Sequence, residues 1–366
     1  MEIIRPTLVL DKKKCLSNIE FMANKAKAAK LRFRPHFKTH ISAEVGSWFR
    51  EYGVTAITVS SVQMAEYFAE DGWDDITIAF PVNPLEIDHI NALAEKVKLN
   101  LVIETSEILR FLNNNLTSLV DFYIKIDTGH GRTGIEADRE SQIESLLEYA
   151  LIYKDNVKFR GFLSHSGHTY QTKARHTIYN IHFDALMKLN RLKTKFSPVF
   201  PDLEISIGDT PACSISDDFR GVDEIRPGNF VFYDLMQQQL SACDYDQIAI
   251  RMVCPIVSKN QSRNEVVIHG GSVHFSKDYI MNIDGKKLYG RIVRREGSKR
   301  ILLNEMNYLH DLSQEHGILK VSPQEFNKFK IGDLVEILPV HACLTAHAMG
   351  WYLTDEGEVI DTMPRH

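Results

Sequence analysis

Short apolar runs alternate with longer amphipathic segments from the start of the chain to about residue 230. Eight runs have the length and composition of buried β-strands: 31–36, 54–60, 76–80, 99–103, 120–126, 159–165, 203–207 and 224–226. Most intervals between them have apolar residues at helical spacing, among them 61–70, 84–96, 140–153 and 172–193. Eight strands that alternate with helices fit a (β/α)8 barrel of the TIM type better than a shorter doubly wound sheet. We therefore expect an α/β protein built on such a barrel.

The pattern changes after about residue 240, where short strand-like runs and turn signals replace the helical segments. The predicted strands there are 248–258, 265–269, 289–293, 334–339 and 351–353. We therefore expect two domains, a barrel over residues 1–240 and a C-terminal β-rich domain over residues 241–366. Residues 1–10, which contain a short apolar run, are expected to pair with the second domain.

Composition and charge argue against several classes of function. The 366 residues are 44% hydrophobic and 25% charged with a formal net charge of -5, which gives no basic field for nucleic acid. The apolar runs are shorter than the roughly 18 residues of a membrane helix, and residues 1–10 lack the pattern of a signal peptide. Five scattered cysteines do not resemble a disulfide framework, so we expect reduced thiols and a cytoplasmic protein.

Lys38 lies among cationic and imidazole side chains directly after the first predicted strand, in the segment Arg34-Pro35-His36-Phe37-Lys38-Thr39-His40. Neighbouring positive charges favour the neutral form of an amine, and a neutral amine can attack a carbonyl carbon and bind it covalently. The alternative is an ordinary basic loop in water. Active sites of (β/α)8 barrels lie at the C-terminal ends of the strands, so the position of Lys38 favours the reactive amine.

Three further polar clusters follow predicted strands of the barrel. They are residues 127–134 with Arg132, residues 165–170 with His165 and Tyr170, and residues 208–213 with Asp209 and Thr210. Each cluster alone has the composition of a turn. With Lys38 they make four clusters on one rim of the barrel, which favours a functional site there.

The segment 208–213 combines a glycine, the hydroxyl of Thr210 and a proline that can begin a helix, so its free backbone amides can bind phosphate. Gly228 and Asn229 lie in a second turn after the eighth predicted strand, and phosphate sites of barrels often follow strands seven and eight. A capped helix without a ligand is the alternative. A phosphate site combined with Lys38 predicts a phosphorylated aldehyde cofactor, for which pyridoxal phosphate is the obvious candidate.

His341 and Cys343 follow the apolar run that ends at residue 340, and on an extended strand residues two apart face the same side. An imidazole and a thiolate can bind one metal ion, and only two protein ligands leave positions for water or substrate. The alternative for Cys343 is a small buried apolar residue. His269 and His274 are expected to be satisfied in the core, whereas Glu315 lies in a predicted polar loop and is a candidate to support the site.

The order of these motifs resembles the D-threonine aldolase and D-serine dehydratase family, whose members have an alanine-racemase-like barrel followed by a β-domain. The resemblance covers almost the whole chain and rests on segments 6–11, 34–40, 208–211, 226–234, 314–317 and 339–343. It implies a homodimer in which Lys38 binds pyridoxal phosphate covalently and the loop with Arg132 approaches the cofactor ring. The remaining cofactor-binding candidates are His165, Tyr170, Asp209, Thr210, Gly228 and Asn229.

Within this family, His341 and Cys343 resemble the dehydratase pattern, because the aldolases carry an aspartate in place of the cysteine. The resemblance implies a lyase that converts a D-3-hydroxy amino acid such as D-serine to a keto acid and ammonia. Thiolate suits zinc better than manganese or magnesium. A metal-dependent D-threonine aldolase, which yields glycine and an aldehyde, is the nearest alternative. An amino-acid racemase needs a second base and no metal, and a non-catalytic pyridoxal phosphate carrier usually lacks the β-domain.

Overall fold

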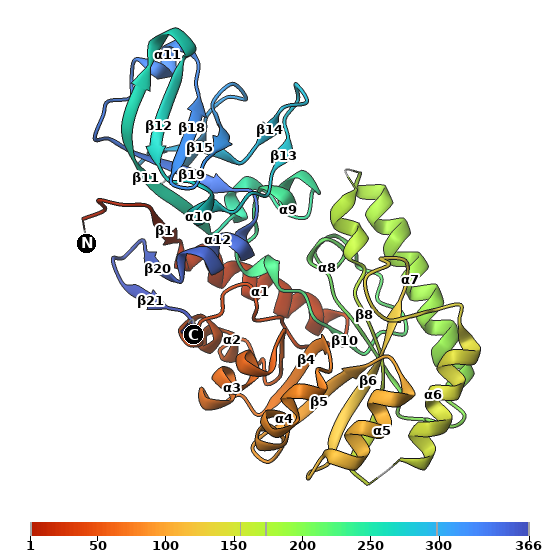
Figure 1. The fold of residues 1–366 in the computed structure, drawn as a ribbon. Helices are drawn as coiled ribbons and strands as arrows, with labels where there is room; N and C mark the ends of the chain where they lie inside the picture. The colour runs from red at the N-terminus through yellow and green to blue at the C-terminus, as the bar shows by residue number, and fades with distance from the viewer. Residues whose placement is uncertain (1, 154, 173, 298, 365–366) are drawn as a thin grey trace. The chain divides into compact units, whose positions relative to one another are not determined.

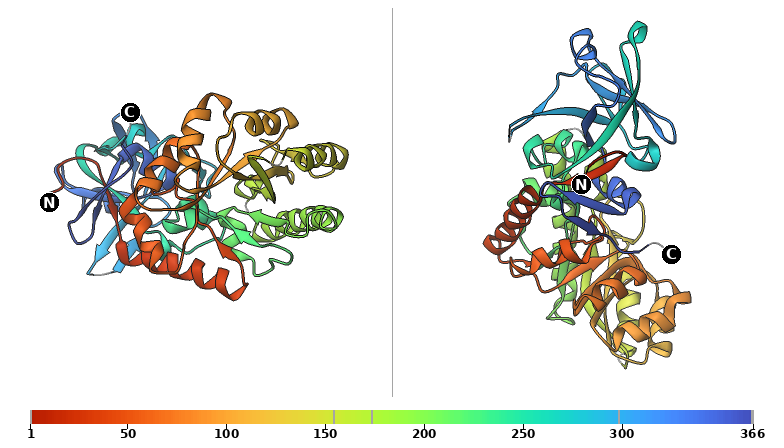
Figure 2. Two further views of the ribbon diagram at one scale, coloured as in Figure 1. Left: turned by 90° about the horizontal axis from the view of Figure 1, so that it is seen from below. Right: turned by 90° about the vertical axis from the view of Figure 1, so that its left-hand side faces the viewer.

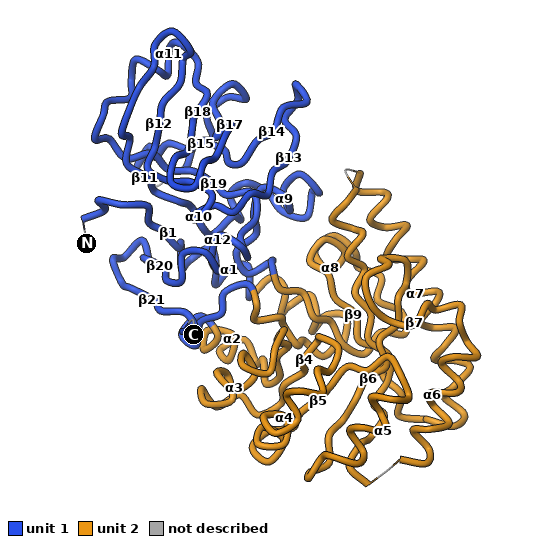
Figure 3. Tube along the Cα trace, viewed as in Figure 1, with its two compact units in different colours: residues 1–19, 39–45, 229–366 blue, residues 20–38, 46–228 orange. Residues whose placement is uncertain are grey.

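The computed structural model describes residues 2–153, 155–172, 174–297 and 299–364. The chain divides into two compact units (Figure 3). The barrel unit comprises residues 20–38 and 46–228, and the β-unit comprises residues 1–19, 39–45 and 229–366. The last boundary between units lies between Gly228 and Asn229. The expected division into domains at residue 240 stays a prediction.

The barrel unit contains a parallel β-barrel, as the sequence predicted (Figure 1). Its eight principal strands are β2 (Arg32–Phe33), β3 (Ile57–Val59), β4 (Asp75–Pro81), β5 (Lys98–Ile103), β6 (Val120–Asp127), β8 (Val157–Ser164), β9 (Glu204–Ile207) and β10 (Glu224–Ile225). They pair in chain order from β3 to β10, and β10 pairs with β2. A parallel bridge between His36 and Thr58 closes the barrel. All eight predicted strands are confirmed, and β7 (Ile135–Glu136) is an additional short strand beside β6.

Helices follow most of the barrel strands along the chain. They are α3 (Val62–Glu70), α4 (Ile87–Ala94), α5 (Ser106–Asn115), α6 (Glu140–Ile152), α7 (Arg175–Phe196) and α8 (Thr210–Ile215), while α1 (Lys12–Ala28) and α2 (Ala43–Arg50) include residues of both units. Figures 1 and 2 show α5, α6 and α7 on the outer side of the strands. Ser61 begins α3 by accepting a hydrogen bond from the N–H of Met64, the usual role of a serine N-cap. In the described ranges, no helix has the length and apolar character needed to cross a bilayer.

Ion pairs occupy the barrel interior near the beginnings of the strands. The guanidinium of Arg34 is fully buried and lies 2.6 Å from Glu224 and 2.7 Å from Asp75. Arg160 on β8 lies 2.9 Å from Glu204 on β9. Because a buried charge without a partner is costly, this network links the short strands β2 and β10 to the rest of the barrel.

The β-unit is built on one mainly antiparallel sheet (Figure 1). Its strands are β1 (Thr7–Leu10), β11 (Ile250–Asn260), β12 (Glu265–His269), β15 (Gly290–Glu296), β16 (Lys299–Leu302), β17 (Tyr308–Leu312), β18 (His316–Lys320), β19 (Leu334–Pro339), β20 (Trp351–Thr354) and β21 (Val359–Asp361). The pairing runs β12, β18, β17, β15, β19, β11, and the long strand β11 also pairs with β12, so six strands close on themselves. Strand β1 joins this sheet by pairing with β11 and β20.

Four short helices and a hairpin complete the β-unit. The helices are α9 (Leu235–Gln239), α10 (Ser272–Phe275), α11 (Pro323–Phe326) and α12 (Ala342–Met349), and the hairpin is β13 (Ile280–Met281) with β14 (Lys287–Leu288). The five strands predicted for this region are confirmed as β11, β12, β15, β19 and β20. Strands β16, β17 and β18 were not predicted, because their short segments mix charged and apolar residues.

Candidate active site

The segment that carries Lys38 is held rigidly after strand β2. Phe37 is fully buried, with ring centroids 5.0 Å from Phe68 and 5.1 Å from Trp73. Two backbone hydrogen bonds of 2.9 Å hold the segment: the N–H of His36 donates to Pro227 O, and the N–H of Phe37 donates to Thr58 O. The side chain of Lys38 is exposed while its neighbours on both sides are buried. The backbone therefore presents this amine from a fixed position at the C-terminal end of the barrel.

Positive charge accumulates at the same ends of the strands. Lys125 on β6 is 6% exposed, and burial together with Arg226 and Arg132 lowers its pKa to about 7. Burial also lowers the pKa of Arg226 to about 10. Its guanidinium donates to the hydroxyl of Ser206 and the carbonyl of Ser164, both at 2.7 Å, rather than to a carboxylate. This end of the barrel can therefore receive an anionic group.

His165, immediately after β8, is held in its neutral form. Its Nδ1 donates to the carbonyl of Gly208. Burial, and then the charges of Lys125 and Lys38, hold the pKa of His165 well below its usual value. The neutral ring leaves Nε2 as a hydrogen-bond acceptor. The imidazole also responds to Arg132, so three of the cations at this rim act on one side chain.

The loop after β6 is organised around the carboxylate of Asp127. This carboxylate accepts hydrogen bonds of 2.8 Å from the N–H groups of Gly129, His130 and Gly131. The side chain of Arg132 extends from the loop into solvent, and among the described residues it has no hydrogen bond. Asp127 thus fixes the backbone of the loop. Within the described residues no hydrogen bond fixes the side chain of Arg132, the predicted contact to the cofactor.

The turn after β9 has the features expected of a phosphate site. Asp209 caps α8 by accepting from the N–H of Ala212 at 2.8 Å, and it also accepts from the hydroxyl of Thr169 at 3.0 Å. Burial raises the pKa of Asp209, which favours its protonated form next to an anion. The hydroxyl of Thr210 is fully buried, and among the described residues it has no hydrogen-bond partner. A hydroxyl of this kind fits a phosphate oxygen.

The two predicted phosphate turns lie against each other. A side chain at Gly208 would come within 2.9 Å of the backbone of Arg226, so only glycine permits this approach. The hydroxyl of Tyr170 accepts from the N–H of Thr210 at 3.2 Å. Gly228 ends the barrel-unit segment that contains Arg226. The structure thus brings together the candidates from residues 165–170, 208–213 and 226–228.

His341 and Cys343 lie at the N-terminus of α12 in the β-unit. Nδ1 of His341 is 2.5 Å from a carboxylate oxygen of Asp278. Burial lowers the pKa of His341, but hydrogen bonds with Asp278 and Cys343 outweigh it and raise the pKa to about 11. The Sγ of Cys343 lies 3.3 Å from the hydroxyl of Thr39, the residue after Lys38. Thiolates are stabilised at helix N-termini, so this position suits a metal ligand.

The strand geometry expected for these two ligands was wrong. Strand β19 ends at Pro339, His341 is the N-cap of α12, and Cys343 belongs to its first turn. The two side chains come together because the first turn of α12 brings them together, and not because they alternate along a strand. Asn229 lies in the same group, because its Nδ2 is 2.6 Å from Asp234 and 3.6 Å from the Sγ of Cys343.

Three residues that the structure adds to these clusters were not selected from the sequence. Lys125 had the position of an ordinary strand residue, and Arg226 was noted only as part of a turn. Asp278 is 63 residues from His341 in sequence, and a histidine ligand that contacts a carboxylate through its other nitrogen is a common arrangement in metal sites. The sequence offers no local signal for this partner.

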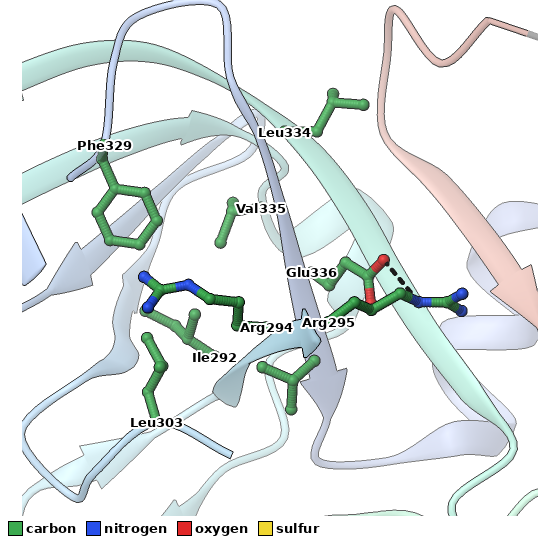
Figure 4. A pocket seen from close by; sticks show the side chains of 9 residues that line it. Ile292, Arg294, Arg295, Leu303, Phe329, Leu334, Val335 and Glu336 are labelled. Atoms are coloured by element: carbon green, nitrogen blue, oxygen red, sulfur yellow. Dashed lines mark ion pairs between the residues drawn. The ribbon is translucent and has the colours of Figure 1, made fainter. Parts of the chain in front are cut away.

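One hollow of the β-unit carries none of the predicted site residues (Figure 4). Its volume is about 170 Å³, and Ile292, Phe329 and Val335 line it beside two arginines. Arg294 pairs with Glu325 at 2.5 Å, and Arg295 pairs with Glu336 at 3.2 Å. Both cations are already neutralised, so this hollow offers little to an anionic substrate.

Two known families match the chain in order. "Alanine racemase, N-terminal domain" matches residues 10–235, and "Putative serine dehydratase domain" matches residues 249–354. The D-serine dehydratase of Dictyostelium discoideum is 28% identical over 377 residues, which cover 93% of this chain and 91% of that protein. The D-threo-3-hydroxyaspartate dehydratase of Delftia sp. (strain HT23) is 24% identical, again with 93% and 91% covered.

Solved structures agree with these matches. The D-threo-3-hydroxyaspartate dehydratase from Delftia sp. HT23 superposes with a TM-score of 0.91 at 23% identity, over 100% of this chain and 98% of that one. D-threonine aldolase from Filomicrobium marinum superposes with a TM-score of 0.83 at 17% identity, over 98% and 94%. The alanine-racemase-like barrel followed by a β-domain is therefore confirmed. The chain belongs to the alanine racemase N-terminal domain family, in the D-serine dehydratase and D-threonine aldolase group that its motifs predicted.

Proposed function

We propose that this protein is a pyridoxal-phosphate- and zinc-dependent dehydratase that converts a D-3-hydroxy amino acid such as D-serine to a keto acid and ammonia. The observation that carries the proposal is the placement of Cys343 beside His341, with Asp278 behind the imidazole. Relatives named D-serine dehydratase and D-threo-3-hydroxyaspartate dehydratase over almost the whole chain support it. The expected homodimer belongs to the same proposal.

The residues of the barrel rim fit pyridoxal phosphate. The buried hydroxyl of Thr210, the backbone around Gly208 and the cations Arg226 and Lys125 suit a phosphate and an anionic substrate. When bound, the cofactor supplies an electron sink for the charge that develops when the α-proton leaves. Lys38 is the amine that holds the cofactor and, once free, takes this proton. His165 is neutral, so it can accept a hydrogen bond here without adding charge.

The pair His341 and Cys343 fits a zinc ion with open coordination positions. Such an ion acts as a Lewis acid on the β-hydroxyl of the substrate. Asp278 fixes the ring of His341 through Nδ1, which leaves Nε2 as the ligand atom. A solved structure of D-threo-3-hydroxyaspartate dehydratase is that of a cysteine-to-alanine mutant in the metal-free form, which agrees with a metal-dependent relative.

Elimination and retro-aldol cleavage differ in what happens at this hydroxyl. Elimination releases it as water and yields an enamine that hydrolyses to a keto acid and ammonia. Retro-aldol cleavage removes its proton and yields glycine and an aldehyde. The relatives named 3-hydroxy-D-aspartate aldolase and D-threonine aldolase keep this second reaction as the alternative.

The test measures products and metal together. The purified protein is incubated with D-serine, D-threonine and D-threo-3-hydroxyaspartate, and ammonia, keto acid, glycine and aldehyde are quantified. We expect ammonia and keto acid without aldehyde. Cys343→Ala should keep the absorption of the lysine-bound cofactor, lose the zinc ion held by His341 and Cys343 and lose about 10³-fold in turnover, because the Lewis acid contributes several kcal/mol.

Cys15→Ala is the matched control, since Cys15 is a buried cysteine of the same unit that lies on α1 and not on the segments of the proposed site. This control should retain both zinc and turnover. Full turnover by Cys343→Ala would remove zinc from the mechanism. Glycine with an aldehyde as the main products would replace the dehydratase by the aldolase.

A further inference from the structure

Three potential metal ligands of the β-unit converge away from His341 and Cys343. They are His269 at the end of β12, His274 in α10 and Glu315 just before β18, and one ligand atom from each lies within 4.8 Å of the others. The expectation that both histidines are satisfied in the core is wrong. The side chain of His269 is 42% exposed, and that of His274 is 15% exposed.

The backbone around this triad is tightly constrained. The N–H of Gly270 donates to Glu315 O at 2.8 Å, and the N–H of Ser272 donates to Ser313 O at 2.8 Å. A side chain at Gly271 would lie only 2.2 Å from the carbonyl oxygen of Gln314. The turn between β12 and α10 is therefore locked against the turn between β17 and β18. The three side chains project from a preorganised frame, as a metal site requires.

The distances within the triad show that hydrogen bonds to Glu315 do not hold the two histidines in place. The carboxylate of Glu315 is 3.6 Å from Nε2 of His269 and 3.9 Å from Nε2 of His274. Both separations are too long for hydrogen bonds. Two ligand atoms about 2.0–2.1 Å from a tetrahedral zinc ion lie roughly 3.4 Å apart, so small side-chain movements bring all three into range. The imidazole planes are nearly perpendicular at 87°, and a single ion can accept both rings.

We propose that His269, His274 and Glu315 form a second metal site, separate from His341 and Cys343. Two imidazole nitrogens and one carboxylate oxygen suit Zn²⁺ and leave a fourth position for water. Because this set contains no thiolate, it should tolerate Co²⁺ or Ni²⁺ better than the cysteine-containing pair does. This proposal does not depend on the reaction that the enzyme catalyses.

Binding has one local consequence at His274. The N–H of Gly271 donates to Nδ1 of His274 at 3.2 Å, so the proton of the neutral ring is on Nε2. To bind zinc through Nε2, the ring must move that proton to Nδ1 and give up the bond from Gly271. One backbone hydrogen bond is thus exchanged for one metal bond. The amide of Gly271 should exchange with deuterium faster when zinc is bound.

The experiment counts zinc in the intact holoenzyme. Chelator-treated protein, with pyridoxal phosphate present throughout, is dialysed against buffered free Zn²⁺, and bound zinc is measured by mass spectrometry. Wild type should bind two ions per chain. Glu315→Gln keeps the shape of the side chain, and His274→Ala removes a ligand. We expect each to bind one ion fewer or to bind it at least about tenfold more weakly.

Control variants distinguish the triad from the pair His341 and Cys343 and from ordinary surface histidines. His89→Ala removes a histidine that lies 2.8 Å from Glu66 without belonging to a triad in the described residues, and it should bind two ions. Cys343→Ala should lose the other ion, and its combination with Glu315→Gln should lose both. Glu315→Gln and His274→Ala variants with wild-type zinc binding would overturn the proposal, as would a single ion that Cys343→Ala loses and Glu315→Gln keeps. A single ion that Glu315→Gln loses and Cys343→Ala keeps would support the triad and count against zinc at His341 and Cys343.

Discussion

Charged side chains at the two ends of the barrel strands differ in whether they have a partner of opposite charge. At the beginnings of the strands, three arginines have carboxylate partners: Arg32 with Glu204, Arg34 with Glu224 and Asp75, and Arg160 with Glu204 and Asp121. At the C-terminal ends, Lys125 and Arg226 are buried with no such ion pair among the described residues. The charges at the first end neutralise each other, whereas the second end keeps positive charge for a ligand.

The pKa shifts follow this division. Burial lowers the pKa of Arg34, but Glu224 and Asp75 outweigh it and raise that pKa. Burial raises the pKa of Glu224, but Arg34 and Arg32 outweigh it and lower it. For Lys125, burial and then Arg226 and Arg132 outweigh the opposing effect of Glu104 and Asp127, and the pKa falls to about 7. In barrels of this kind, the first end serves stability and the second serves catalysis.

The largest difference between the two ends should appear at lysine. Lys38→Ala should remove the absorption of the lysine-bound cofactor and reduce turnover by about 10⁴-fold, because the proposed proton acceptor is gone. Its melting temperature without cofactor should stay close to that of wild type, since the side chain is exposed. Spectra, steady-state rates and thermal melts measure these effects.

Lys98→Ala is the matched control at the other end. Lys98 begins β5, is about half exposed and lies 3.7 Å from Asp75. This variant should keep the cofactor spectrum and the turnover, because exposed ion pairs contribute little. Loss of turnover in both variants would show that the two ends do not divide these roles.

Breaking the ion-pair network should affect stability instead. Glu224→Gln removes one of the two carboxylate partners of the buried Arg34 and leaves Asp75, which should cost up to about 3 kcal/mol of the free energy of unfolding. The double variant Arg34→Met with Glu224→Gln should lose less than the sum of the single variants, since both charges of the fully buried pair are then removed together. Urea unfolding of the cofactor-free protein measures both. An unchanged midpoint for Glu224→Gln would contradict the stabilising role.

The fold was predictable because the barrel strands are short, mainly apolar runs, even where a buried polar residue such as Lys125 interrupts them. Runs such as 99–103 and 120–126 carry few polar residues and are separated by regular helical intervals. In the β-unit, strand β19 was equally clear, whereas β16 begins Lys299-Arg300 and β18 begins with His316. Strands of four or five residues with charged ends give too few positions to reveal a period of two.

The candidate site was predictable only where its residues act within one segment. Lys38 and Asp209 lie in the segments that follow β2 and β9, so the ends of the predicted strands were sufficient to find them. The contact of Asp278 with His341 depends on the packing of α10 against α12, which no sequence period encodes. The charge environment of Lys125 is likewise set by Arg226, which is far from it in the chain but close in the barrel.

A smaller effect should appear in the pH dependence of stability. The pKa of Lys125 is about 7 in the folded protein against 10.5 for an ordinary lysine. Between these values the unfolded chain binds the extra proton, so stability rises with pH by up to about 1.4 kcal/mol per unit. Lys125→Met should abolish this rise and be more stable than wild type below pH 7. Urea unfolding between pH 6 and 9 tests it, and parallel curves for both proteins would rule out the lowered pKa.

The smallest expected effect is on the stability of the folded protein when Asp209, at the C-terminal end of the barrel, is replaced. Asp209→Ala removes the cap of α8 and should cost about 1–2 kcal/mol, whereas Asp209→Asn can still accept from Ala212 and Thr169 and should cost less. Asp209 is a buried acid beside the proposed phosphate turn, and a negative charge there would repel a phosphate. The Asp209→Asn variant should therefore retain the cofactor on dialysis at least as well as wild type. Weaker retention by Asn than by wild type would mean that the carboxylate itself binds the cofactor. The C-terminal end of the barrel would then need the negative charge of Asp209 for cofactor binding, and not only its role as the cap of α8.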